Sequence, residues 1–223
     1  MSAVDPYAFM SPAAAGPGVA LRTPMERRHI AAGAAIEERG GWRIGVYPGE
    51  GEGEGDPWVV DISHLGKLDL RATAAGIDEL TGGLAPGEAR ADGGVWTMRL
   101  TPTHGYVLCP FDRVESIRSA TGGAAIDVTC GLAGVAVGGE RRRDVMNRSS
   151  GLDVRPSRFP ANRCMAGSVM RVPTLVLNED GRISMFVGWE YGEYFWDAIL
   201  DAGAPLGIGA RTPAAARSPE AVA

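Results

Sequence analysis

The stretch that decides the fold runs Asp61-Ile62-Ser63-His64-Leu65-Gly66-Lys67-Leu68-Asp69-Leu70-Arg71. Its beginning predicts a turn, because the side chains of Asp61 and Ser63 can bond backbone N–H groups two residues further on. Gly66 permits a left-handed or closely packed backbone. From Leu68 to Arg71, apolar and polar residues alternate with the period of a half-buried strand. The stretch therefore predicts a turn that leads into a strand.

Length and composition are those of a soluble globular chain. The 223 residues, of which 45% are hydrophobic and 22% charged, suffice for one domain with a substantial core. No apolar run reaches the roughly 18 residues of a membrane-spanning helix. The N-terminus, Met1-Ser2-Ala3-Val4-Asp5, lacks the basic and apolar regions of a signal peptide. We therefore expect a cytoplasmic protein without a membrane partner.

Charge and cysteine content argue against two classes of function. The formal net charge of −5 argues against a nucleic-acid partner, which requires a dense basic face. The three cysteines, Cys109, Cys130 and Cys164, are scattered and have neither metal-ligand spacing nor a disulfide pattern. We expect them to be buried thiols, and we expect no metal site.

Composition divides the chain into three parts. Residues 1–20 are rich in Ala, Pro, Gly and Ser and predict a flexible lead. Residues 21–210 predict the folded domain, interrupted by an acidic, glycine-rich loop over residues 48–56. Residues 211–223 predict a disordered tail, because few of them can bury apolar surface.

Two runs of strands, hairpins and helices follow one another within the folded part, and the second loosely repeats the first. The first run has hairpin strands over residues 95–100 and 106–109, and the second has a hairpin turn at Asn178-Glu179-Asp180-Gly181. Further strands are predicted over residues 164–172 and 174–177. Helices are predicted over residues 23–32, 73–81, 112–120, 141–146 and 191–202. Thr23 and Glu26 are expected to form a capping box at the start of the first helix, and Asp112 is expected to cap the helix over residues 112–120. This pattern predicts an α+β fold made of two related strand-helix-hairpin halves.

The opening stretch also resembles the D-x-S-H-x-G-K segment of the glycine-cleavage T-protein family, the tetrahydrofolate-dependent aminomethyltransferases. The sarcosine oxidase γ-subunit is in the same superfamily. Other family motifs have counterparts in the same order over about residues 22–205. They are Thr23-Pro24-Met25 with His29, Gly33-Ala34, Gly41-Trp42, Gly93-Gly94-Val95, Val137-Gly138-Gly139 and the segment from Tyr194 to Leu200. The resemblance implies the folate-binding domain of the aminomethyltransferases, with tetrahydrofolate as the cofactor.

The family's catalytic pattern is only partly present. In the family, the GG[IV] motif is followed by one residue and then two acids, whereas this chain has Thr97 and Met98 in their place. A carboxylate there would support proton transfer and stabilise a cation, which neither residue does. Thr97, at the acid position, and His64, which can act as acid, base or ligand, are the catalytic candidates. For His64, and for His29, a simple hydrogen-bond bridge is the alternative, and His104 is expected in solvent at a hairpin tip.

Four residues are candidates for cofactor binding. Glu179 could bind a pterin edge through its two oxygens, and Arg171 could bind the carboxylate of a folate tail. Trp96 and Tyr106, on paired strands, could stack on a flat ring. The alternative for Glu179 is a residue of a solvated hairpin turn, and the alternative for Arg171 is a surface charge. Trp96 and Tyr106 could instead be core aromatic residues.

Three functions remain open at this point. The first is folate-linked one-carbon transfer or demethylation by a single-domain aminomethyltransferase-like protein. Full-length family members have a further C-terminal domain over the cleft, so a partner protein chain or a homo-oligomer could complete the site around a small-molecule substrate. The second is a non-catalytic subunit of an oxidase-like complex. The third is a repurposed folate-independent enzyme acting on another small molecule.

Overall fold

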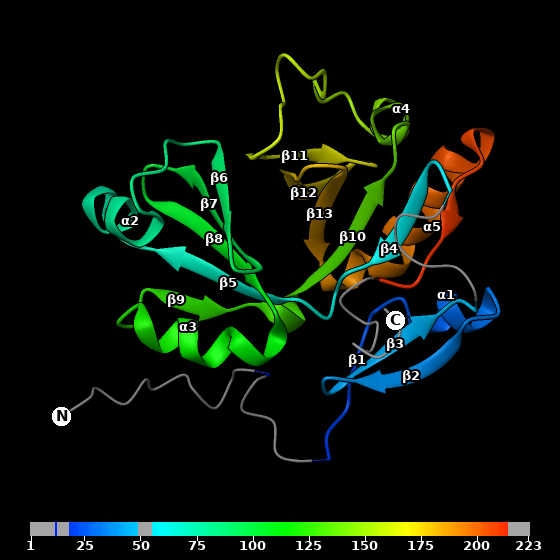
Figure 1. The fold of residues 1–223 in the computed structure, drawn as a ribbon, viewed down its shortest axis with the longest axis horizontal. Coiled ribbons are helices and arrows are strands. Elements are labelled where there is room, and N and C mark those ends of the chain that lie inside the picture. Colours follow the sequence, from blue (N-terminus) through cyan, green and yellow to red (C-terminus); the bar gives the residue numbers. More distant parts are fainter. Residues whose placement is uncertain (1–11, 13–17, 49–54, 214–223) are drawn as a thin grey trace.

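The computed structural model describes residues 12, 18–48 and 55–213 (Figure 1). Most of the lead predicted for residues 1–20 and of the acidic loop predicted for residues 48–56 lies outside these residues. The predicted tail from residue 211 lies outside them from residue 214 onward. At the end of the described chain, the Arg211 N–H donates to Val59 O at 2.9 Å, and the Thr212 hydroxyl accepts from the Tyr47 N–H at 2.8 Å.

The α+β fold and its internal repeat are confirmed. The first half consists of β5 (Gly66–Arg71), α2 (Ala74–Thr81), β6 (Glu88–Asp92), β7 (Val95–Thr101), β8 (His104–Cys109), α3 (Val114–Ala120) and β9 (Ala125–Asp127). The second half has the same order: β10 (Leu132–Gly138), α4 (Arg142–Ser149), β11 (Arg163–Val169), β12 (Val172–Asn178), β13 (Arg182–Gly188), α5 (Gly192–Gly203) and β14 (Gly209–Ala210). A 3-10 turn precedes α3 and α5 alike, and the residues capping these turns, Pro110 and Gly188, share φ −52° and ψ 140°.

The strands of both halves form one 11-stranded sheet that must curl. Its order is β14-β4-β10-β13-β12-β11-β6-β7-β8-β5-β9, where β4 is Trp58–Asp61. In a flat sheet β4 and β5 would lie about 38 Å apart, at roughly 4.8 Å per strand. The connection from Asp61 to Gly66 spans at most about 18 Å. The opening stretch therefore draws the two ends of the sheet toward each other and gives it a concave face.

A second, three-stranded sheet lies beside the first. It has the order β1-β3-β2, formed by β1 (Leu21–Arg22), β3 (Trp42–Val46) and β2 (Ala35–Arg39), and is accompanied by α1 (Glu26–Ala31). Trp42 packs edge-to-face on Phe111 of the first half, with ring centroids 5.6 Å apart, and lies 6.5 Å from the Trp189 ring of the second. The small sheet thus contacts both halves of the large one.

The concave face has its own hydrophobic core. We call it the concave core, and its buried members come from strands throughout the large sheet and from the β4–β5 connection: Trp58, Val60, Ile62, Ala89, Met98, Leu108, Ala136, Cys164, Leu175, Leu177 and Phe186. Two further cores lie on the outer faces, where α2 and α3 cover the first half and α4 and α5 the second. The alternation of side chains along each strand separates these cores from the concave one.

Several local predictions are wrong. Strand β6 was not expected, because Glu88–Asp92 carries only alanines between charged residues; it forms by pairing with β7. Thr23 does not cap α1, since its hydroxyl bonds the carboxylate of Asp61 instead. Asp112 lies inside the 3-10 turn that precedes α3 and makes no cap bond. By contrast, Thr73 caps α2 as predicted, accepting from the Gly76 N–H at 3.2 Å.

The turn between β11 and β12 falls at Met170 and Arg171, earlier than predicted. Val169 pairs with Val172, and the two turn residues have φ 49° and 64°, as in a type I′ turn. Neither is glycine, so the turn stores backbone strain.

We expect Arg171→Gly to stabilise the protein by about 1 kcal/mol, because glycine adopts a left-handed conformation without this strain. The measurement is thermal unfolding followed by circular dichroism. Arg158→Gly is the matched control, because Arg158 is also exposed and has no positive φ, so it should lose stability slightly. A lower melting temperature for Arg171→Gly would contradict the strained turn.

Candidate functional site

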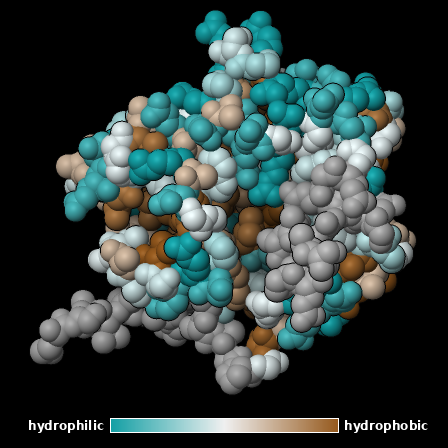
Figure 2. All heavy atoms as spheres, viewed as in Figure 1, coloured by the Kyte–Doolittle hydropathy of each residue, from teal (hydrophilic) through white to brown (hydrophobic). Residues whose placement is uncertain are grey.

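A cleft of about 640 Å³ opens beside the concave core, between the two halves. Figure 2 shows hydrophobic residues in the hollow between the halves. The cleft is lined by Pro86, Gly87, Leu100, Thr101, His104, Tyr106, Leu132, Cys164, Met165, Ala166, Gly167, Pro173, Thr174, Leu175, Phe186 and Gly188. Its volume lies within the range of about 300–1,000 Å³ typical of sites for small organic ligands.

Most of the lining is apolar and chemically inert. Leu175 and Phe186 belong to the concave core, and Leu100 and Leu132 pack against it. Cys164 is the one thiol in the lining, and burial raises its pKa to about 11. It therefore stays protonated near neutral pH and is a poor nucleophile. These walls suit a flat apolar ring.

One end of the cleft is polar, because strand register brings four side chains together. Asp69 of β5 pairs with Tyr106 of β8, and Arg71 pairs with His104. Asp69 Oδ1 lies 2.9 Å from His104 Nε2 and accepts from Arg71 Nε at 2.9 Å. Its Oδ2 accepts from Arg71 Nη2 at 3.2 Å and from the Tyr106 hydroxyl at 3.5 Å. We call these four residues the polar cluster.

The charges of the polar cluster are set by this carboxylate. Burial, and then the charge of Asp69, raise the pKa of Tyr106 to about 12, so Tyr106 is a neutral hydrogen-bond donor at physiological pH. The hydrogen bond to Asp69 raises the pKa of Arg71, which therefore stays positively charged. The cluster offers a ligand the imidazole of His104 and the phenol of Tyr106 at the end of an apolar cleft, and Asp69 contacts both of them.

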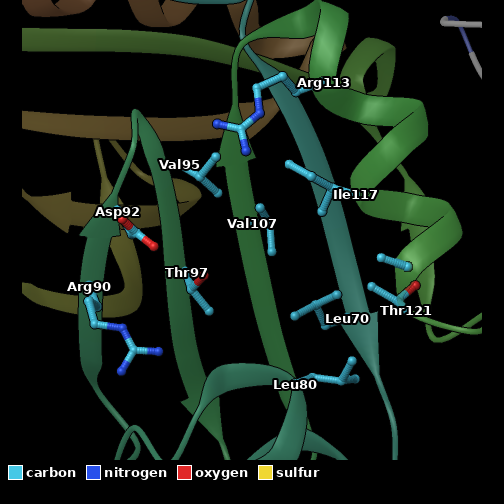
Figure 3. Close-up of a pocket in the computed structure, with 11 residues that line it drawn as sticks. Leu70, Leu80, Arg90, Asp92, Val95, Thr97, Val107, Arg113, Ile117 and Thr121 are labelled. Carbon is cyan, nitrogen blue, oxygen red and sulfur yellow. The ribbon is translucent and has the colours of Figure 1, made fainter.

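Of the predicted site residues, Tyr106 lines the cleft and Trp96 packs against the concave core beside it. Thr97 lies on the opposite face of β7, because neighbouring residues of a strand point to opposite sides. It lines a separate hollow of about 350 Å³ on the face covered by α2 and α3. Figure 3 shows it there, with Arg90 and Asp92 on the neighbouring strand β6. Met98 faces the concave core and is fully buried.

Neither Glu179 nor Arg171 lines the cleft. The Glu179 carboxylate accepts from the Ser184 hydroxyl and lies 2.9 Å from Arg182 Nη2, so it is held within the β12–β13 hairpin. Arg171 is exposed at the strained turn between β11 and β12. The β12 residues that line the cleft are Pro173, Thr174 and Leu175.

His64 is half-buried in the turn before β5 and does not line the cleft either. Its neighbours hold this turn together. The Lys67 ammonium is fully buried and donates to Ser63 O, Leu65 O and Thr129 O at 2.7, 2.8 and 3.1 Å. Burial lowers the pKa of Lys67 to about 8. Asp61 Oδ1 accepts from the Ser63 N–H at 2.8 Å, as the sequence predicts.

His29 belongs to a second buried network, which joins the two sheets. Its Nδ1 lies 2.8 Å from the Tyr47 hydroxyl and its Nε2 lies 2.9 Å from Asp61 Oδ2. The ring is also 4.8 Å, edge-on, from that of Trp196. Both ring nitrogens are engaged, so His29 is a hydrogen-bond bridge, the alternative that the sequence left open.

Sequence reasoning missed Asp69 and His104. His104 was expected in solvent at a hairpin tip, but its side chain is only 16% exposed and contacts Asp69. The alternation in Leu68-Asp69-Leu70 indicates that Asp69 faces away from the first-half core. Only the pairing of β5 with β8 brings His104 and Tyr106 to it.

Comparisons with known proteins agree with this fold. No protein-family model matches the sequence. An aminomethyltransferase of Frankia alni is 27% identical over 246 residues, covering 85% of this chain and 61% of that protein. The chain thus spans about three fifths of the length of this curated relative.

Two solved structures share the architecture. Aminomethyltransferase T of the glycine cleavage system of Bartonella henselae gives a TM-score of 0.67 at 12% identity, covering 86% of this chain and 59% of that one. A chain of the heterotetrameric sarcosine oxidase of Corynebacterium sp. U-96 gives 0.63 at 19% identity, covering 84% of this chain and 97% of that one. The resemblance to aminomethyltransferases and the predicted fold are confirmed.

Within residues 12, 18–48 and 55–213, no three His, Cys, Asp or Glu side chains are grouped to hold a metal ion. None of the helices in this part of the chain is long and apolar enough to cross a membrane.

Proposed function

We propose that the cleft binds a reduced folate, and that the chain takes part in folate-linked one-carbon transfer or demethylation. The observation that carries the proposal is the cleft itself, with apolar walls and the polar cluster at one end. Similarity to an aminomethyltransferase supports the same reaction class. Tetrahydrofolate would supply the carrier of the one-carbon unit.

The lining fits such a cofactor in size and in chemistry. A pterin ring is flat and has N–H donors and acceptors along its edges. Leu175 and Phe186 offer apolar surface for the ring, and His104 and the Tyr106 hydroxyl, which also line the cleft, can hydrogen-bond to its edge. These residues are the ones that would hold a folate.

A second candidate is a non-catalytic subunit of an oxidase-like complex. Two observations favour it. Thr97 and Met98 replace the family's two acids, and neither brings a polar group into the cleft. The aligned chain of sarcosine oxidase is part of a heterotetramer and is matched over 97% of its length. Folate binding without turnover by the isolated chain, and turnover after addition of a partner chain, would favour this candidate.

The direct test is a calorimetric titration of the purified chain with tetrahydrofolate. We expect saturable binding, and we expect Ala166→Trp to weaken it by about tenfold or more, because a bulky ring at an exposed position of the lining obstructs the cleft. Arg171→Gly, outside the cleft, should bind like the unmodified protein. Absence of binding at millimolar folate would refute the proposal and favour the folate-independent alternative. Equal binding by Ala166→Trp would place the folate elsewhere.

A further inference from the structure

The polar cluster places a carboxylate behind the lining residues His104 and Tyr106, whereas β7 brings none to the cleft. Met98 pairs with Tyr106, and Tyr106 pairs with Asp69, so the three residues form one row across β7, β8 and β5. Residues directly paired in a sheet point to the same face. Asp69 therefore stands two strands, or about 10 Å, from Met98 on the same side of the sheet.

His104 connects this carboxylate with the cleft. Both His104 and Tyr106 line the cleft, and their rings lie 4.9 Å apart. His104 Nε2 is 2.9 Å from Asp69 Oδ1, although the N–H direction is not aligned for a hydrogen bond. A small rotation of the ring would align it, as happens when catalytic pairs tighten around a ligand. The other nitrogen, Nδ1, has no hydrogen-bond partner among the described residues and remains open to a ligand.

We propose that His104 is a general base in the cleft and that Asp69 orients it. The substrate class is a flat, N–H-bearing ligand, a description that rests on the proposed function. The ligand's N–H bond breaks, its electron pair stays on the ligand nitrogen, and the proton forms a new N–H bond at His104 Nδ1. Asp69 holds the proton at Nε2 and stabilises the resulting imidazolium.

The surrounding charges suit this role. Arg71 donates to both oxygens of Asp69 and lies on the solvent side, with 59% of its side chain exposed. Tyr106 is held neutral, and its hydroxyl can accept from the ligand while it donates to Asp69. The alternative is a cross-strand polar cluster that only stabilises the β5–β8 pair.

The test is modification by diethyl pyrocarbonate, which acylates the free lone pair of a neutral imidazole, followed by peptide mass spectrometry. We expect His104 to react, while His29 stays unmodified because it is buried and both its nitrogens are engaged. At about pH 8, above the ordinary imidazole pKa of about 6.5, the rate at His104 in Asp69→Asn should fall by about threefold, because a neutral amide makes Nδ1 less basic than a carboxylate does. Asp92→Asn, in the hollow on the opposite face of the sheet, is the matched control and should leave the rate unchanged.

The outcomes separate this inference from the proposed function. An unreactive His104, or an equal modification rate in Asp69→Asn, would overturn the proposal that His104 is a base, even if tetrahydrofolate binds. If the modification rate at His104 depends on Asp69 but folate does not bind, the role of His104 as a base is supported and the folate proposal is refuted. If both hold, saturating tetrahydrofolate should protect His104 in the unmodified protein. Circular dichroism and melting temperature establish that each variant is folded before its rate is compared.

Discussion

Asp61→Ala is expected to destabilise the protein by about 3–5 kcal/mol, because it removes a buried carboxylate that accepts three hydrogen bonds. The carboxylate is 6% exposed and accepts from the Thr23 hydroxyl, from the Ser63 N–H at 2.8 Å and from His29 Nε2 at 2.9 Å. Its loss leaves these buried donors without a partner. We expect the melting temperature to fall by roughly 10 °C.

Stability should also depend on this carboxylate in acid. Burial opposes its charged form, but the hydrogen bond and charge of His29 and the bonds from Thr23 and Ser63 prevail and keep the pKa of Asp61 below its usual value. In the unfolded chain this carboxyl has a pKa of about 3.9, so near that pH it binds more protons than in the folded protein. Its contribution to the stability of the fold is therefore present above that pH and is lost as the pH falls below it. Asp61→Ala should lack this part of the acid dependence.

The control for Asp61 is Asp153→Ala. Asp153 is an ion-paired carboxylate as well, with Arg155 as its partner, but both side chains are exposed, and such surface pairs contribute little to stability. Its melting temperature should stay close to that of the unmodified protein. If the two variants melted alike, the buried network around Asp61 would not be the element that holds the two sheets together.

Gly66→Ala is the second large expected effect, a loss of about 1–3 kcal/mol from overpacking. A Cβ atom at this position would overlap a methyl group of Val114 and lie 2.9 Å from Cys109 Sγ. Val114 begins α3 and is fully buried, so the helix or the strand β8 would have to move. Chemical denaturation followed by tryptophan fluorescence measures the loss.

Gly131→Ala is the matched substitution in open surroundings. There the nearest atom to an added Cβ is Val128 Cβ at 3.9 Å, an ordinary contact, so we expect unchanged or slightly higher stability. A Gly66→Ala protein as stable as Gly131→Ala would mean that α3 can shift without cost.

The candidate site was only partly predictable from sequence. Tyr106 and Trp96 were predicted because aromatic residues on paired strands suggest stacking; Tyr106 lines the cleft and Trp96 lies beside it. Thr97 was chosen by its place in a motif, yet the alternation along β7 directs it to the other face. Asp69 and His104 stand 35 positions apart and come together only through the register of β5 and β8.

The sequence by itself determined the α+β class, the repeat of the two halves and the turn at Asp61 and Ser63, because local periodicity and turn chemistry act over a few residues. The tertiary structure alone decided that Gly66 serves close packing and that β6 is a strand, since both depend on distant neighbours. It also decided where the cleft lies. A short connection between β4 and β5 curls the whole sheet, and strand order and register, which no local signal encodes, then determine which polar side chains meet.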